Sequence, residues 1–89
     1  MSPKLIWSKR SMKRFRKFPP EIKDKLCKKI KIFEKDPFDP RLKTHRLQGK
    51  LYGYFAFSID YSYRVIFRPS DEEKNYFEII NVGQHSMYE

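Results

Sequence analysis

The sequence predicts an α+β fold in which a short N-terminal strand and a two-helix hairpin pack on a small antiparallel β-sheet. Apolar residues recur at helical spacing in the first third of the chain, and they alternate with a period of two from Leu51 onward. Prolines at 19–20 and within 36–40 divide the helical stretches from each other and from the sheet. With 89 residues, we expect a single domain over residues 1–89.

The first elements are a short strand and a basic helix. Residues 4–7 contain an apolar group that predicts the strand, and Ser8 can cap a helix that runs toward Phe18. Three apolar residues predict the buried face of this helix: Met12, Phe15 and Phe18. Basic residues, among them Lys13 and Arg14, cover its other faces. Their mutual repulsion destabilises the helix, and an anionic partner would relieve it.

The second helix carries the clearest periodic signal in the chain. Pro20 suits its first turn, and the segment 36–40, with two prolines, ends it. Apolar residues repeat at intervals of four, four and three: Ile22, Leu26, Ile30 and Phe33. We expect the two helices to form an antiparallel hairpin.

Three strands are predicted in the second half of the chain. The first follows Leu51, the second covers residues 63–68, and the third covers residues 76–82 after a polar turn at 69–74. We expect an antiparallel meander. The residues that should face the helices are Phe55, Phe57, Ile59, Tyr63, Val65 and Phe67. The opposite, open face should then present three side chains on which bases could stack and by which phosphates could be neutralised: Tyr54, Arg64 and Arg68.

The net charge of the chain limits the classes of partner that it can bind. Twenty Lys and Arg against eleven Asp and Glu give a net charge of +9, which suits nucleic acid, an anionic membrane or an acidic protein. No apolar run approaches the roughly 18 residues of a membrane span, and the N-terminus lacks a signal-peptide pattern. The single Cys27 excludes an intramolecular disulfide, and no Cys/His spacing indicates zinc. We therefore expect a cytoplasmic protein with no membrane contact and no metal.

Several segments resemble the RelE/ParE superfamily of toxins, and the likeness extends over essentially the whole chain. The most specific are Leu47-Gln48-Gly49-Lys50 with Gly53-Tyr54, the strand 63–67, and the ending 83–88. The resemblance implies a RelE-like, microbial-RNase-like fold and a cognate antitoxin partner. Members of the RelE and YafQ type are endoribonucleases that cleave mRNA in the ribosomal A site without a metal or a small-molecule cofactor. It therefore also implies mRNA and ribosomal RNA as partners.

The resemblance implies four catalytic residues. Arg64 matches an arginine that holds the scissile phosphate, a role for which a permanently charged, two-pronged guanidinium is suited. His85 matches a histidine of the YafQ-like branch that serves as general acid or base. Tyr88 matches an aromatic residue that stacks on a base or assists proton transfer, and His45 matches a further histidine of that branch. The alternatives are a solvated strand arginine, a frayed terminus and an incidental surface histidine.

The chain also departs from the family pattern. Ala56 and Ser58 stand where RelE-type members have lysines, and Ser62 stands where others have an acidic residue, for which Asp60 is close enough to substitute. Lys50, Arg41 and Arg46 are possible replacement cations. The side chains expected to bind RNA are therefore Lys50, Arg46, Arg68, Tyr54, Lys13 and Arg14.

Two other functions fit the sequence. A ParE-like toxin would bind DNA gyrase and cleave no RNA, which the missing strand lysines favour and the histidine-bearing ending disfavours. A non-catalytic RNA-binding module would need only the basic surface, and both histidines would be incidental.

Overall fold

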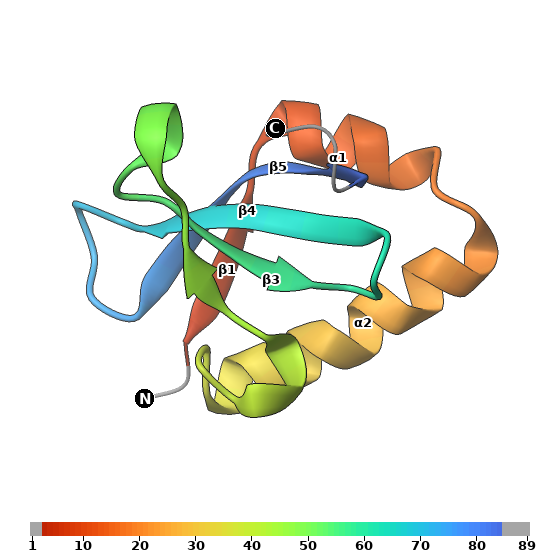
Figure 1. Ribbon diagram of the computed structural model, residues 1–89, viewed down its shortest axis with the longest axis horizontal. Helices are drawn as coiled ribbons and strands as arrows, with labels where there is room; N and C mark the ends of the chain where they lie inside the picture. Colours follow the sequence, from red (N-terminus) through yellow and green to blue (C-terminus); the bar gives the residue numbers. More distant parts are fainter. Residues whose placement is uncertain (1–2, 85–89) are drawn as a thin grey trace.

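The computed structural model describes residues 3–84, which form an α+β structure with two α-helices and a five-stranded sheet (Figure 1). The elements in chain order are β1 (Lys4–Trp7), α1 (Lys9–Arg16), α2 (Pro20–Lys35), the 3-10 helix η1 (Pro40–Leu42), β2 (His45–Arg46), the 3-10 helix η2 (Gly49–Leu51), β3 (Phe55–Ser58), β4 (Tyr63–Pro69) and β5 (Tyr76–Gln84). The strand order is β1-β5-β4-β3-β2. The predicted fold class is confirmed. No helix within residues 3–84 has the length and hydropathy needed to cross a membrane.

The sheet is mixed rather than wholly antiparallel. Strands β3, β4 and β5 form the predicted antiparallel meander, but β1 joins the free edge of β5 in parallel. Its register places Leu5 beside Phe77 and Trp7 beside Ile79, so the buried face of the sheet continues onto β1. The two-residue strand β2 on the far edge was not predicted.

Helix α1 begins as predicted, and Phe15 and Phe18 of its predicted face pack on the core, but Met12 does not. The Ser8 side chain accepts a hydrogen bond from the Ser11 backbone N–H, which is an N-cap. Ser11, rather than Met12, is fully buried, and its hydroxyl donates to the carbonyl oxygen of Ile79 at 3.3 Å. Phe15 packs on the core as expected. A small hydroxyl with a partner on β5 allows the helix to lie close against the sheet.

The main core lies between the helices and the sheet. Phe33 of α2 is fully buried and packs on three sheet phenylalanines at ring-centre distances of 5.1–5.5 Å: Phe57, Phe67 and Phe77. Replacing such a ring by alanine costs about 3–5 kcal/mol. The α2 periodicity therefore identified the centre of the fold.

The opposite face of the sheet is partly covered, and the prediction of an open face is wrong there. Leu47, Ala56 and Ile66 form a second buried cluster, against which Leu51, Tyr54 and Ile80 pack. The segment between β2 and β3 folds over this cluster. A β-bulge in β5 adds Ile80 to this cluster. Ile66 pairs with Asn81, but Phe67 pairs with Ile79, so Ile80 is an extra residue in β5, and its side chain packs on the second cluster.

Candidate active site and nucleic-acid interface

Arg64 lies on β4, on the sheet face opposite the helices, between Ser58 of β3 and Gly83 of β5. The side chain is half-buried. Its Nη1 atom donates to the carbonyl oxygens of Asp60, at 2.6 Å, and of Tyr63, at 3.1 Å. Among residues 3–84, no carboxylate lies within 4.0 Å of it. The guanidinium is thus oriented without losing its charge, and its remaining N–H groups can bind an anion.

The turn between β3 and β4 holds Arg64 in place. The Asp60 carboxylate accepts from the backbone N–H groups of Ser62, at 2.8 Å, and Tyr63, at 2.9 Å. The Ser58 hydroxyl donates to the Asp60 carbonyl oxygen at 2.7 Å. This Asx turn fixes the carbonyl that Arg64 contacts.

Asp60 remains ionised in this turn. Burial alone would raise the pKa of Asp60, but the N–H groups of Ser62 and Tyr63, together with Lys25 at 3.7 Å, lower it overall. A carboxylate with a lowered pKa and occupied oxygens is a weak proton acceptor. The general-base role suggested for Asp60 stays a prediction; the contacts seen here are those of the turn, whose carbonyl oxygen also accepts a hydrogen bond from Arg64.

The departures at Ala56 and Ser58 have a structural explanation. Ala56 is fully buried in the second cluster. Ser58 is 7% exposed, and its hydroxyl group donates a hydrogen bond to the Asp60 carbonyl oxygen in the turn. A lysine at position 56 would have to displace the residues that pack on Ala56, and a lysine at position 58 would remove the hydroxyl group that contacts Asp60. The packing of this sheet face therefore explains why positions 56 and 58 carry no lysine.

His45 lies on the same sheet face as Arg64, but β3 separates their strands. It pairs with Ala56, is exposed, and its Nδ1 lies 3.1 Å from the carbonyl oxygen of Lys43. Because a carbonyl only accepts, this contact needs the proton on Nδ1, and Nε2 is then the acceptor in the neutral ring. His45 can therefore offer a proton acceptor to a bound strand.

Two of the suggested cations are neutralised by neighbouring carboxylates. Arg68 donates to Glu78, its partner on β5, at 2.8 Å, and this bond raises the pKa of Arg68. Arg41 makes two contacts of 3.0 Å with Asp39 and lowers the pKa of that carboxyl to about 2. Each guanidinium group therefore has a carboxylate partner, and the RNA-binding role of Arg68 and the replacement role of Arg41 stay predictions.

The other predicted RNA-binding residues have different surroundings. Arg46 points to the helix side of the sheet, where its guanidinium carbon lies 5.5 Å from the centre of the Phe55 ring. Tyr54 is half-buried against the second cluster, so it offers little surface for stacking. Lys50 is exposed in η2 and has no carboxylate within 4.0 Å in the described part of the chain.

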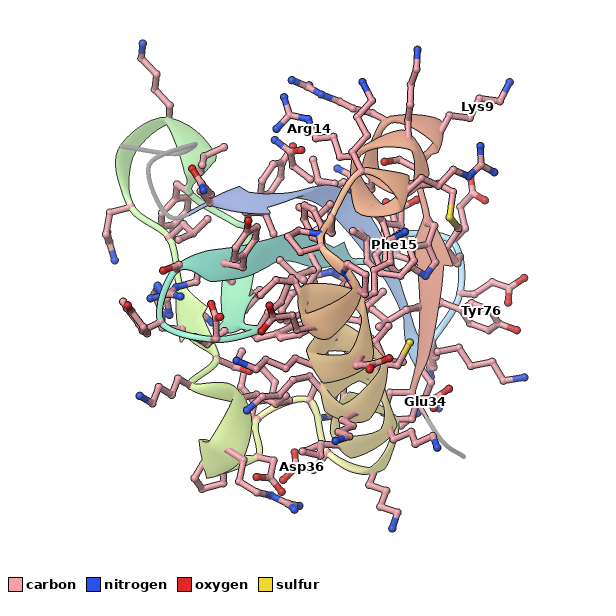
Figure 2. All side chains as sticks on the ribbon, turned by 90° about the vertical axis from the view of Figure 1, so that its right-hand side faces the viewer. Lys9, Arg14, Phe15, Glu34, Asp36 and Tyr76 are labelled. Atoms are coloured by element: carbon pink, nitrogen blue, oxygen red, sulfur yellow. The ribbon has the colours of Figure 1, made fainter. Side chains whose placement is uncertain are left out.

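Helix α1 presents a continuous stripe of positive charge. Positions i, i+3, i+4 and i+7 bring four exposed cations to one face, around a shallow groove of about 250 Å³: Arg10, Lys13, Arg14 and Lys17. Figure 2 shows Lys9 and Arg14 extending from this helix away from the body of the protein. No carboxylate of residues 3–84 lies within 4.0 Å of these groups. The predicted positions Lys13 and Arg14 therefore belong to a surface whose cations have no carboxylate partner among the described residues.

His85 and Tyr88 lie outside the described residues, so their roles stay predictions. The last described residues of β5 are the relevant neighbours: Gly83 pairs with Arg64, and Gln84 pairs with Tyr63. His85 follows Gln84 directly in the sequence.

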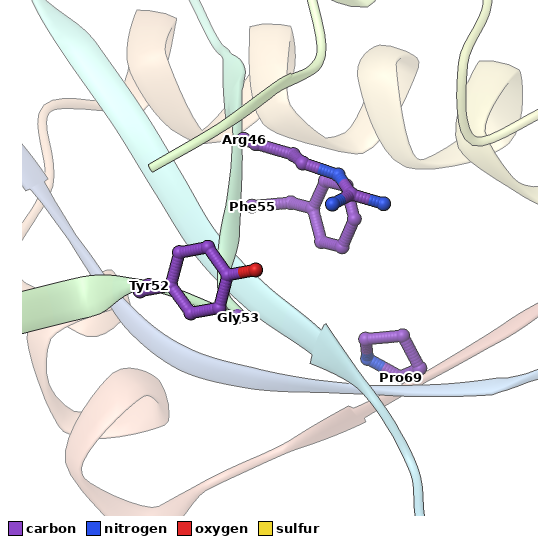
Figure 3. A pocket seen from close by; sticks show the side chains of 5 residues that line it. All are labelled: Arg46, Tyr52, Gly53, Phe55 and Pro69. Atoms are coloured by element: carbon purple, nitrogen blue, oxygen red, sulfur yellow. The ribbon is translucent and has the colours of Figure 1, made fainter. Parts of the chain in front are cut away.

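A pocket that was not predicted opens on the helix side of the sheet, where β2 and β3 meet the end of β4 (Figure 3). It has a volume of about 280 Å³ and is lined by Arg46, Tyr52, Gly53, Phe55 and Pro69. The available sequence signal was an aromatic residue beside a glycine in a loop, Tyr52-Gly53. The strand pattern assigned Phe55 to the core, and it gave no indication that one side of the ring borders a cavity.

These features define a small, strongly basic α+β protein with an oriented arginine on the sheet face opposite its helices. Its structural neighbours include several toxins. A YoeB/ParE toxin from Agrobacterium tumefaciens matches with a TM-score of 0.76 and 24% identity, over 92% of this chain and 98% of that chain. The RelBE2 toxin-antitoxin complex from Mycobacterium tuberculosis matches with a TM-score of 0.77 and 20% identity, over 96% of this chain and 100% of that chain. YafQ from E. coli matches with a TM-score of 0.65 and 17% identity, over 94% of each chain.

The chain therefore has the fold of the RelE/ParE toxins, as the sequence resemblance predicted. At these identities the likeness concerns the fold alone. Comparison with protein-family models finds no match, and comparison with the sequences of curated proteins also finds none.

Proposed function

We propose that this protein is the toxin of a type II toxin–antitoxin pair and cleaves mRNA in the ribosomal A site without a metal. The observation that carries the proposal is the state of Arg64, which two carbonyl groups orient and no carboxylate of the described residues neutralises. The cytoplasm is the expected compartment, because ribosomes and mRNA are there. The Mycobacterium tuberculosis neighbour, a toxin-antitoxin complex, supports an antitoxin as the second partner.

The proposed reaction is an internal transesterification. The ribose 2′-hydroxyl attacks the adjacent phosphorus, the bond to the 5′-oxygen breaks, and the products carry a 2′,3′-cyclic phosphate and a 5′-hydroxyl. Arg64 stabilises the charge that builds on the phosphoryl oxygens. His85 acts as general acid or base, His45 offers its Nε2 to the substrate, and Tyr88 stacks on a base or assists proton transfer.

The α1 stripe gives this toxin a docking surface for ribosomal RNA. Like charges at i and i+4 destabilise the isolated helix, and phosphates placed along the stripe would relieve that repulsion. Such contacts are independent of sequence and weaken with salt. A Lys13→Gln/Arg14→Gln variant should bind ribosomes less tightly and with a shallower salt dependence. The matched control is Lys28→Gln/Lys31→Gln on the exposed side of α2.

The direct test is inducible expression in a bacterial host, with mapping of cellular mRNA 5′ ends after growth stops. The proposal predicts growth arrest with cuts in frame with codons, and the loss of both in Arg64→Ala. Arrest without mRNA cuts would contradict it.

The burial of Ala56 and Ser58 favours a second candidate, a ParE-like toxin that binds DNA gyrase. Without lysines at positions 56 and 58, the protein has fewer cations near Arg64 than RelE-type toxins are expected to have. A gyrase supercoiling assay with the purified protein separates the two candidates. RNA binding without arrest would instead indicate a non-catalytic RNA-binding module.

A further inference from the structure

The pocket beside β2 gathers exposed aromatic surface. Large hydrophobic side chains are exposed at only four positions in residues 3–84: Ile6, Phe38, Tyr52 and Tyr61. Two of them lie next to Phe55. Tyr52 is 74% exposed and lines the same pocket as Phe55. Phe38 is 56% exposed, and the centre of its ring lies 5.7 Å from the centre of the Phe55 ring. One exposed aromatic ring that lines a cavity, and a second that contacts its lining, indicate a binding surface.

Two aromatic residues of this pocket differ in their surroundings: the Phe55 ring packs on another ring of the sheet, whereas the Tyr52 ring is exposed. The Phe55 ring is stacked on Phe67 at 5.7 Å and 23°, which anchors it to the core. Arg46 lies against the same ring, with its guanidinium carbon 5.5 Å from the ring centre. Tyr52 makes no aromatic contact and no side-chain hydrogen bond with the described residues, and Figure 3 shows its ring across the pocket from Arg46 and Phe55.

Gly53 makes this arrangement possible. Its φ of +94° lies in the left-handed region, where only glycine is unstrained, and the chain reverses there. Tyr52 can then stand at the pocket while Tyr54, two residues on, packs in the second cluster on the other sheet face. The two tyrosines therefore serve different surfaces.

We propose that this pocket binds one unpaired nucleobase of RNA, stacked between Tyr52 and the Arg46–Phe55 pair. Aromatic rings and guanidinium planes are the groups on which proteins stack single-stranded bases. No acidic residue lines the pocket, and Arg46 has no carboxylate within 4.0 Å in the described residues, so a nearby phosphate would meet an available cation. This inference rests on the proposed function, in which single-stranded RNA is the substrate.

The size and place of the pocket fit a single base. Pockets for small molecules start at about 300 Å³, so a cavity of about 280 Å³ accommodates one ring system and leaves the sugar and phosphate outside. The adjoining residues of β2 face opposite sides of the sheet: His45 lies on the side of Arg64, and Arg46 lies at the pocket. A strand that crosses this edge can contact both. The pocket is a site for a base away from the scissile phosphate.

The test uses a short, unstructured RNA with 2′-O-methyl groups, which cannot be cleaved by the proposed reaction, and measures its binding by fluorescence anisotropy. Tyr52→Ser should weaken binding about 5- to 100-fold, the range expected for one stacked base. Tyr52→Phe keeps the ring and should bind like the wild type. Because Tyr52 is largely exposed, neither change touches the core.

An abasic RNA of equal length and charge isolates the base contribution. The inference predicts that it binds wild type and Tyr52→Ser equally. A Tyr52→Trp variant should show quenched tryptophan fluorescence when the base-bearing RNA binds, relative to the signal of Trp7 in the parent protein.

The possible failures are distinguishable. If RNA binds the wild type and Tyr52→Ser equally well, the base site is wrong and the proposed function stands. If Tyr52→Ser also binds the abasic RNA less tightly than the wild type does, the contact does not involve a base and the inference is overturned. The inference is likewise overturned if Tyr52→Ser weakens binding of the antitoxin but not of RNA, because the pocket then binds a protein. If wild type binds no RNA and cuts no mRNA, the proposed function itself fails.

Discussion

Arg64 and Arg68 lie four residues apart on one strand and on one face of the sheet, yet their surroundings differ. Arg68 meets the Glu78 carboxylate at 2.8 Å, and Arg64 meets the Asp60 carbonyl at 2.6 Å. A carboxylate orients an arginine and cancels its charge, whereas a carbonyl dipole orients it and leaves the net charge available. We therefore expect the partner, more than the residue type, to decide which of the two arginines can hold a phosphate.

The largest expected effect comes from removing each arginine in turn. Arg64→Ala should lower the rate of mRNA cleavage on purified ribosomes about 10²–10³-fold, the loss typical of one preorganised group that stabilises transition-state charge. Arg68→Ala makes the same charge change on the same strand and should leave the rate nearly unchanged. Equal losses in single-turnover assays would remove the distinction between the two ends of β4.

The Asp60 turn should matter for both stability and Arg64. Asp60→Ala removes two hydrogen bonds to backbone N–H groups, at a net cost of about 1–3 kcal/mol in the free energy of unfolding. Because Arg64 then loses its fixed carbonyl partner, the cleavage rate should fall as well. Urea denaturation measures the first effect. Asp24→Ala, at an exposed position of α2, is the control, and an equal loss of stability there would contradict the assignment.

The pH dependence of stability offers a sharper view of the same turn. The folded-state pKa of Asp60 lies below its ordinary value of 3.8. A lowered pKa contributes stability that is present above the unfolded-state pKa and is lost as pH falls through the folded-state pKa. Wild type should therefore lose more free energy of unfolding than Asp60→Asn between pH 5 and the acid limit of about pH 2. Parallel pH profiles would show that Asp60 contributes nothing in this range.

The smallest effect should come from freeing Arg68. Glu78→Gln leaves Arg68 without its carboxylate partner, so the variant should bind RNA slightly more tightly. The salt dependence should steepen by about 0.7 in log–log slope, the value for one further phosphate on a single strand. Glu73→Gln in the exposed β4–β5 turn makes the same charge change. If Glu73→Gln gives the same steepening, the effect is one of net charge rather than of Arg68.

Elements with a strong local signal could be predicted from the sequence. The α2 periodicity, the Ser8 cap and the alternating pattern of the meander each arise from neighbouring residues, and the structure confirms them. The parallel edge strand β1 and the two-residue strand β2 depend on pairing across the chain, which local patterns do not encode. The burial of Ser11 depends likewise on the Ile79 carbonyl, 68 positions away.

The candidate site also contains residues that local patterns place and residues whose contacts depend on pairing across the chain. Arg64 could be placed on the correct face because strand alternation fixes it. The pairing of Arg68 with Glu78 depends on the β4–β5 register, which a bulge shifts, and no sequence pattern signalled the bulge. Arg46 was expected among RNA-binding groups, but its place against Phe55 and the exposure of Tyr52 depend on how the β2–β3 segment folds back. His85 and Tyr88 remain predictions from the resemblance.

The proposed role of Arg64, which no carboxylate of residues 3–84 neutralises, is to support cleavage of mRNA by its own 2′-hydroxyl. The most direct measurement is the chemistry of the RNA ends produced when purified protein acts on ribosomes carrying a defined mRNA. The claim predicts a 2′,3′-cyclic phosphate and a 5′-hydroxyl from wild type and from Arg68→Ala, and no such ends from Arg64→Ala. The same ends from Arg64→Ala at the wild-type rate, or a 3′-hydroxyl with a 5′-phosphate from the wild type, would contradict it.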